Sequence, residues 1–239
     1  MDEHRHLADG AGANDAVQVA TRRYLSSEHL WSSLHATRRC RAIETELLGK
    51  VRVDIEHRTY AMTAVLSAVA FLEALVNETY DDAHDTQHDS GRIAALDGRA
   101  RGLMAAFWQA TRGRDRYVGV LDKYRMALLF AGAPPFDQGA NPYQDAELLI
   151  RLRNELVHFR PTWHEQGVPD KFGDKLAERF APSGLLPAND GSPWITRALG
   201  AGGAAWAYNT CKAFADAWTD RLGIARAYEA DLAAWEQGP

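Results

Sequence analysis

Arg153, Asn154 and His158 lie close together in the stretch "LIRLRNELVHFRP", which runs from Leu149 to Pro161. A neutral histidine can take the proton of an RNA 2′-hydroxyl near pH 7, because its unperturbed pKa is about 6.5, and a second histidine can donate one to the departing 5′-oxygen. Arginine presents a planar, permanently charged fork to the phosphate as charge develops in the transition state. Asn154, one helical turn before His158, can orient the imidazole or the phosphate. These residue types fit such a reaction, which needs no metal and would leave a 2′,3′-cyclic phosphate and a 5′-hydroxyl.

A helix must position these side chains. Asn141 and Pro142 predict where it begins, since asparagine caps helices and proline suits the first helical turn. Pro161 predicts its end, because proline disfavours helical geometry in the preceding residue and has no N–H to donate. At about 100° per residue, one broad apolar stripe of this helix is expected to pack into a bundle. The stripe consists of Leu148, Leu149, Leu152, Leu156 and Phe159.

The opposite side of the same helix carries a second apolar pair. Ile150 and Val157 lie side by side there, with Arg153 on one flank and Asn154 and His158 on the other. A surface helix would normally be polar at these positions, so we expect a partner to cover this face. A second copy related by a two-fold axis would bring the arginine flank of one subunit near the histidine flank of the other. The sequence therefore predicts a homodimer whose interface includes the apolar pair and whose composite cleft holds two arginines and two histidines.

The rest of the sequence predicts an all-α helical bundle with one domain over residues 17–239. Residues 1–16 are polar and predict a flexible N-terminal tail. Residues 81–91 have the composition of a loop, and residues 161–203, rich in proline and glycine, predict a mostly irregular excursion before the last helix. One short helix is expected near residues 170–180 within that excursion. The other helices are predicted at 17–49 with a stop at Gly49, at 51–82, 92–111 and 117–131, and from 204 towards the tail.

The composition, 46% hydrophobic and 25% charged over 239 residues, is that of an ordinary globular protein. The longest apolar run, Tyr60 to Val76, is short for a bilayer span and contains Glu73, so we expect a buried core helix and no membrane partner. Cys40 and Cys211 lie far apart in a chain without a recognisable signal peptide, so neither a disulfide framework nor a cysteine-ligated zinc site is indicated. We therefore expect a cytoplasmic protein without a metal or other cofactor.

The formal net charge of −5 lowers the expectation of nucleic-acid binding without excluding it. The segment around Arg153 and His158 is nevertheless locally basic, because Arg151, Arg153 and Arg160 are offset only by Glu155. This local charge could attract an RNA backbone despite the acidic total, so Arg151 and Arg160 are candidate RNA-binding residues.

"RNELVH", Arg153 to His158, resembles the R-x(4–6)-H motif of the HEPN superfamily, including the polar asparagine that commonly follows the arginine. HEPN domains are α-helical bundles, many of which dimerise through the motif helix and act as metal-independent ribonucleases in toxin–antitoxin, CRISPR and other defence systems. The resemblance extends over "LIRLRNELVHFRP" and is supported by the preceding long helix with "FLEALVNE". It implies a HEPN bundle formed by Thr59 to Phe159 and the final helix, an antitoxin or regulatory protein as a further partner, and catalysis by Arg153, Asn154 and His158.

Other interpretations stay open. A HEPN module can keep its bundle, be catalytically silent, and bind nucleotide, RNA or a protein partner. Without the resemblance, Arg153 and His158 would form surface salt links and a satisfied hydrogen bond at a helix C-terminus, where the dipole favours cations. His84 and His88, spaced i, i+4 among aspartates, would suit a divalent metal in a metal-dependent helical-bundle enzyme, although a solvated acidic turn is the simpler interpretation.

Three further features have a structural and a functional interpretation. Glu73 is expected to be a buried partner for an arginine and so to support the site structurally, with a direct role near the site as the alternative. The glycines at 200–203 are interpreted as a flexible helix entry rather than an anion site, because a full glycine-rich fingerprint is absent. Four aromatic residues at helical spacing are predicted to lie in the core rather than to stack on bases. They are Trp206, Tyr208, Phe214 and Trp218.

Overall fold

The computed structural model describes residues 22–50, 53–86, 91–111, 118–161, 170–187 and 192–237. Within these ranges the chain is helical and contains no strand, so the predicted all-α class is confirmed. The predicted tail, residues 1–16, lies outside the described residues. The helices are α1 (Ser26–Leu47), α2 (Ile55–His84), α3 (Gly98–Thr111), α4 (Val120–Phe130), α5 (Tyr143–Val157), α6 (Lys171–Ala177), α7 (Trp194–Arg197), α8 (Ala201–Leu222) and α9 (Ala227–Glu236).

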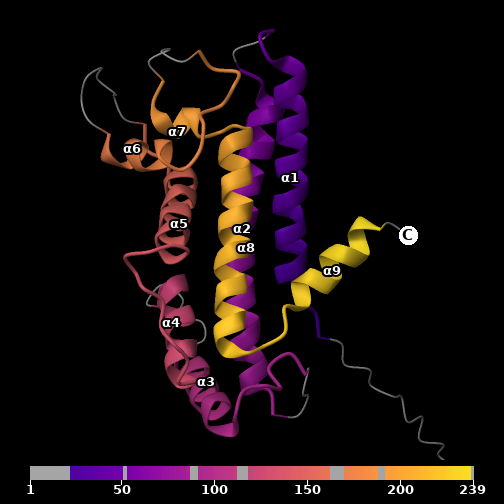
Figure 1. Cartoon of the computed structure of the whole chain (residues 1–239), viewed down its shortest axis with the longest axis vertical. Helices are drawn as coiled ribbons and strands as arrows, with labels where there is room; N and C mark the ends of the chain where they lie inside the picture. Colours follow the sequence, from indigo (N-terminus) through magenta and orange to yellow (C-terminus); the bar gives the residue numbers. More distant parts are fainter. Residues whose placement is uncertain are drawn as a thin grey trace, which may run out of the picture.

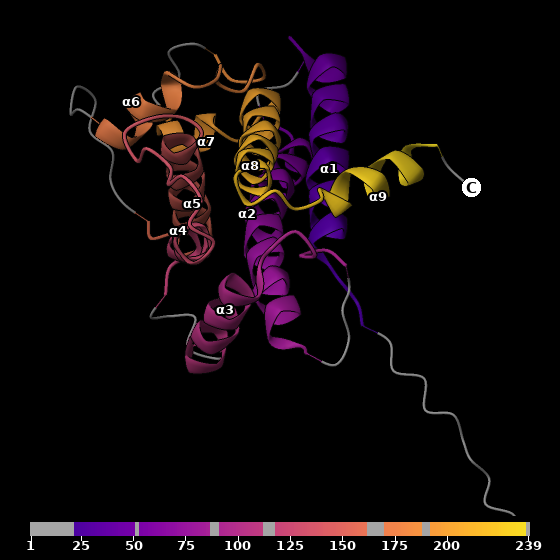
Figure 2. The same ribbon diagram turned by 60° about the horizontal axis from the view of Figure 1, so that its bottom comes forward.

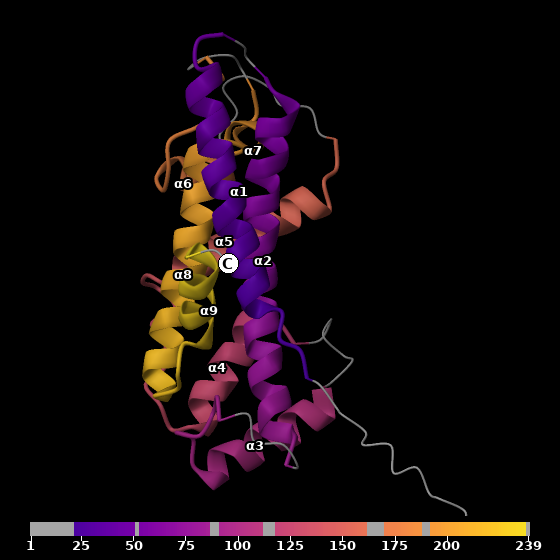
Figure 3. The ribbon, with the colours of Figure 1, turned by 90° about the vertical axis from the view of Figure 1, so that its right-hand side faces the viewer.

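Helix α2 is the centre of the bundle. It packs against α1, α8, α3, α5 and α4, and the residues of its apolar run are buried on several faces. Figures 1 and 3 show α1, α2 and α8 running side by side along the long axis. In Figures 1 and 2, α3, α4 and α5 follow one another on the side of α2 and α8 away from α1. The long apolar run therefore forms the core helix that its composition predicts.

The ends of α2 differ slightly from the prediction. The helix begins at Ile55, after the Asp54 carboxylate, which accepts a hydrogen bond from the His57 backbone N–H at 2.7 Å. It continues to His84, so the first residues of the predicted 81–91 loop are helical. Among the described residues, one helix, α2, is long and apolar enough to cross a membrane, judged by length and composition only. In this fold, 50% of its most apolar window is buried.

The last predicted helix is two helices. Helix α8 ends at Leu222 because Gly223 takes a left-handed conformation, φ 68°, and α9 begins at Ala227. Helix α8 also begins earlier than predicted, at Ala201. The predicted core aromatics Trp206, Phe214 and Trp218 are buried, as expected, and Tyr208 is half-buried.

The glycines before and within the first turn of α8 allow close packing, and their interpretation as a flexible helix entry was wrong. A Cβ at Gly200 would lie 2.5 Å from Ser183 Cα, and one at Gly202 would lie 2.4 Å from the Ala181 carbonyl oxygen. A Cβ at Gly203 would lie 2.1 Å from the Ala198 carbonyl oxygen. These positions need glycine because neighbouring backbone comes too close for any side chain.

The irregular excursion is anchored on the end of the bundle where α1 ends and α8 begins (Figure 1). Its predicted short helix is α6, capped by Asp170, whose carboxylate accepts hydrogen bonds from the Phe172 and Gly173 N–H groups. Glu44 of α1 accepts hydrogen bonds from Gly184 N–H at 3.2 Å and Ala201 N–H at 2.9 Å. One carboxylate thus ties the excursion and the N-terminus of α8 to α1.

Helix α5 carries the Arg153–His158 motif and differs from the prediction at both ends. Pro142, not Asn141, is the N-cap residue, and no side chain caps the helix there. The helix ends at Val157, several residues before Pro161, so the proline is not what ends it. The His158 N–H donates to the Asn154 carbonyl oxygen at 2.9 Å. The chain therefore leaves the helix at His158 itself.

The predicted leucine stripe of α5 is confirmed except at its end. Leu148, Leu149 and Leu152 are buried, and Leu156 is half-buried against the core. Phe159 is 59% exposed, so its assignment to the stripe was wrong. Helical-wheel positions do not apply to it because the backbone leaves helical geometry at His158, the C-cap residue, one position earlier.

Substitutions in this stripe should separate its buried part from its exposed end. Leu149→Ala should lower the free energy of unfolding by about 2–5 kcal/mol, because it opens a cavity beside α2 and α8. Phe159→Ala should change it by no more than about 0.5 kcal/mol, because its ring already lies mostly in solvent. Urea unfolding followed by circular dichroism measures both values. Equal losses for the two variants would contradict this packing.

Candidate functional site

The three motif side chains lie on the outer side of the last turns of α5. Arg153 is half-buried, whereas Asn154 and His158 are exposed. Asn154 and His158 are four residues apart and so lie about 40° from one another around the helix axis. Arg153 and His158 are five residues apart, which places them about 140° from one another. The motif therefore faces two directions.

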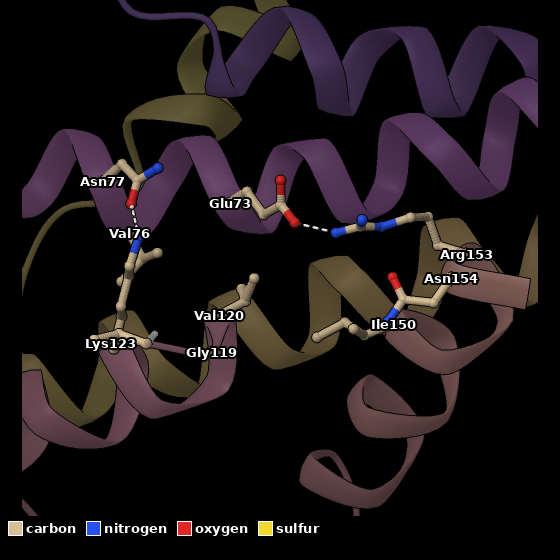
Figure 4. A pocket seen from close by; sticks show the side chains of 10 residues that line it. Glu73, Val76, Asn77, Gly119, Val120, Lys123, Ile150, Arg153 and Asn154 are labelled. Atoms are coloured by element: carbon tan, nitrogen blue, oxygen red, sulfur yellow. Dashed lines mark hydrogen bonds and ion pairs between the residues drawn. The ribbon is translucent and has the colours of Figure 1, made fainter. Parts of the chain in front are cut away.

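Arg153 faces a groove of about 340 Å³ between α2 and the α4 and α5 helices, which we call the Arg153 groove (Figure 4). One Arg153 guanidinium nitrogen donates to a carboxylate oxygen of Glu73, and the two side chains form an ion pair. Glu73 thus pairs with an arginine, as expected, but its side chain is 41% exposed rather than buried. The pair holds the guanidinium across the groove in a fixed direction.

The other end of the Arg153 groove has a second polar contact that sequence reasoning missed. Lys123 of α4 is buried, and its Nζ donates to the Asn77 side-chain oxygen at 2.8 Å (Figure 4). Asn77 follows Glu73 by one turn on the same side of α2, so the i, i+4 spacing of two polar residues in an apolar run was a usable signal. Ile150 and Val120 separate the two polar contacts and make the middle of the groove apolar (Figure 4).

His158 faces a different groove, of about 560 Å³, which we call the His158 groove. Arg151 and Arg160 line it as well, so two of the three locally basic residues lie beside the histidine, whereas Arg153 lines the other groove. The Arg151 guanidinium lies 4.4 Å from the centroid of the Phe172 ring in a cation–π contact. The other residues that line the His158 groove are Asn154, Glu155, Phe159, Asp170, Phe172 and Ile195.

Asn154 lines both grooves and is the residue that they share. Arg153 lines only the first and His158 only the second. In one chain the Arg153 guanidinium and the His158 imidazole therefore line different grooves, on either side of Asn154.

The predicted dimer residues have unequal exposure. Ile150 is half-buried and packs against the core of its own chain, while Val157 is 53% exposed at the end of α5. Val157 lies next to His158 in the chain and offers an apolar surface that its own chain leaves uncovered. It is therefore the better of the two candidates for a contact between copies.

The surroundings of His84 do not suit the alternative metal site, because an arginine lies among the neighbouring aspartates. Arg22 donates to Asp85 and Asp81 at 3.0 Å and lies 3.3 Å from Asp82, so a guanidinium occupies the centre of the described acidic group. Its positive charge opposes a divalent cation at the same place. His88, the second proposed ligand, lies outside the described residues.

Comparisons with protein-family models, with curated proteins and with solved structures give no match for this chain.

Proposed function

We propose that this chain is a metal-independent endoribonuclease of the HEPN type, acting in the cytoplasm as a toxin or defence effector. The observation that carries the proposal is the position of the motif: Arg153, Asn154 and His158 share the exposed end of one helix in an all-α bundle. An antitoxin or other regulatory protein is a further partner in this proposal.

The reaction needs two groups that one copy presents in different directions. His158 takes the proton from the ribose 2′-hydroxyl, whose oxygen then attacks the phosphorus, while the bond to the 5′-oxygen breaks and a second His158 protonates that oxygen. Arg153 stabilises the charge that develops on the phosphoryl oxygens. With α5 helices meeting around a two-fold axis near Val157, the arginine of one copy and the histidine of the other face one cleft.

The His158 groove supplies the binding surface for RNA. Arg151 and Arg160 add positive charge to a groove whose acidic residues are Glu155 and Asp170. The carboxylate of Asp170 is engaged in capping α6. The arginines can therefore contact the phosphate backbone on either side of the scissile bond.

A catalytically silent HEPN module is the second candidate, and one contact favours it. The Glu73 carboxylate offsets part of the Arg153 charge, which weakens the interaction with a phosphate. Such a module would bind RNA, nucleotide or a protein partner through the same grooves without cleaving. The two candidates differ in whether purified protein produces new RNA ends.

Purified protein should cut single-stranded or loop RNA in the presence of EDTA and leave 2′,3′-cyclic phosphate and 5′-hydroxyl ends. His158→Ala and Arg153→Ala should each lower the rate by about 10²-fold or more, because they remove the base and the transition-state charge. Asn154→Ala should lower it less. Gel analysis of labelled RNA measures the rates, and phosphatase and kinase treatment identifies the ends.

Circular dichroism of the same variants is the control for folding. If both single variants keep the wild-type rate with intact helices, another site or a contaminant cuts the RNA. If wild-type protein leaves RNA intact and is harmless on expression, with or without candidate activators, the silent module is the correct candidate.

Wild-type protein should be a dimer at tens of micromolar, a range in which specific dimers are populated. Val157→Asp should give a monomer, because it places a charge at the apolar centre of the contact. Leu129→Asp is the matched control, since Leu129 is 67% exposed on α4 and far from the motif in sequence. Light scattering measures the mass of each. A monomeric wild-type protein would exclude a composite site.

Glu73 should act as a positioning residue for Arg153. Glu73→Gln keeps an acceptor oxygen for the guanidinium and should stay within about 3-fold of the wild-type kcat, whereas Glu73→Ala should lose roughly 10-fold through misplacement of Arg153. Single-turnover cleavage separates this loss from weaker RNA binding. A rise in rate for Glu73→Ala would show that the carboxylate masks the arginine instead.

A further inference from the structure

Three side chains of metal-ligating type meet at the end of the bundle where the excursion is anchored. Cys40 and Glu44 lie one turn apart on α1, and His57 lies in the first turn of α2. One potential ligand atom of each lies within 4.8 Å of the others, and His57 Nε2 is 2.7 Å from Glu44 Oε2. Cys40 and His57 are buried, and the Glu44 side chain is only 16% exposed. Among the residues that the structure describes, no other group of this kind occurs.

We propose that Cys40, Glu44 and His57 bind a zinc-class divalent cation that fastens the excursion to the bundle. Thiolate, imidazole and carboxylate together are a ligand set that zinc accepts, and three protein ligands leave a fourth position for water. This proposal is independent of the ribonuclease proposal, because it concerns other residues and a structural role. The two cysteines gave no sequence signal for it, since only one of them contributes.

Glu44 is held in place for such a role by the backbone. Its oxygens accept hydrogen bonds from the N–H groups of Gly184 and Ala201, which come from the excursion and from the start of α8. An ionised carboxylate has about four lone-pair sites, so these two bonds and the His57 contact leave capacity for a cation. The amides act as outer partners that orient the ligand, as in other protein metal sites.

The Cys40 thiol must lose its proton to bind a cation. Burial and the nearby Glu44 charge raise the pKa of the Cys40 thiol to about 12, so the thiol stays protonated without a cation. A divalent cation that binds the Cys40 sulfur replaces the thiol proton, which leaves to solvent.

A bound cation would join segments that lie far apart in the sequence. Glu44 already contacts α2, the excursion at Gly184 and the start of α8. The excursion also supplies Phe172 and Ile195, which line the His158 groove. The cation would therefore restrain the segment from which one wall of that groove is built.

Cobalt(II) reports directly on a thiolate ligand. Protein stripped with a chelator and titrated with Co²⁺ should show a sulfur-to-cobalt charge-transfer band that saturates at one cobalt per chain. Zinc should displace the band and raise the melting temperature by roughly 5 °C or more when in large excess over its dissociation constant. Native mass spectrometry should show one zinc.

Cysteine variants decide which thiol is responsible. Cys40→Ser should abolish the charge-transfer band, and His57→Gln should weaken cobalt binding at least 10-fold. Cys211→Ser is the matched control and should keep the band, because Cys211 is also buried but belongs to no such cluster among the described residues. If Cys40→Ser does not fold, the wild-type titration and the Cys211→Ser control still decide. No band in wild-type protein, or its loss in Cys211→Ser, would overturn the proposal and leave Glu44 and His57 as a hydrogen-bonded pair beside a neutral thiol.

Discussion

The burial of α2 is the constraint on which the fold depends. An apolar helix of 30 residues has to be covered along its length, and α1, α8 and the α3–α5 series cover it from different sides. Its polar residues lie where a neighbouring element supplies a partner: His57 meets Glu44, Glu73 meets Arg153, and Asn77 meets Lys123. A polar group within such a helix would be costly without a partner, so these residues also fix where the other elements dock.

Helical geometry imposes the second constraint, which concerns the site. A spacing of five residues turns Arg153 and His158 about 140° away from one another, and the two side chains line different grooves. The same spacing becomes useful when two copies of α5 meet, because each copy then offers its arginine to the histidine of the other. The proposed chemistry would therefore use such an assembly, with exposed Val157 beside the motif as its proposed apolar contact.

The sequence predicted the helical class, the core position of the long apolar run and the leucine stripe, because periodic burial leaves a direct pattern. It failed where contacts are not local. The glycines at 200–203 looked like a flexible entry, yet the backbone at Ser183 and Ala181 requires them, and that approach is set by tertiary packing. The break at Gly223 and the end of α5 at Val157 were missed because capping is decided by backbone conformation within one turn. In the site, the cost of a carboxylate in an apolar run predicted that Glu73 would pair with an arginine. Which arginine forms the pair, Arg153, could not be predicted from the sequence.

The proposed chemistry depends on two α5 helices meeting through their exposed ends, and a cysteine cross-link tests this contact most directly. The two native cysteines are buried, so a new thiol introduced by Val157→Cys would be the accessible one in the described part of the chain. A disulfide forms only where two Cα atoms come within about 7 Å. Mild oxidation should give a covalent dimer of Val157→Cys that still cuts RNA, while Leu129→Cys, at a more exposed position on α4, should stay monomeric on a non-reducing gel. A Val157→Cys protein that remains monomeric, or cross-links no better than Leu129→Cys, would contradict the composite site.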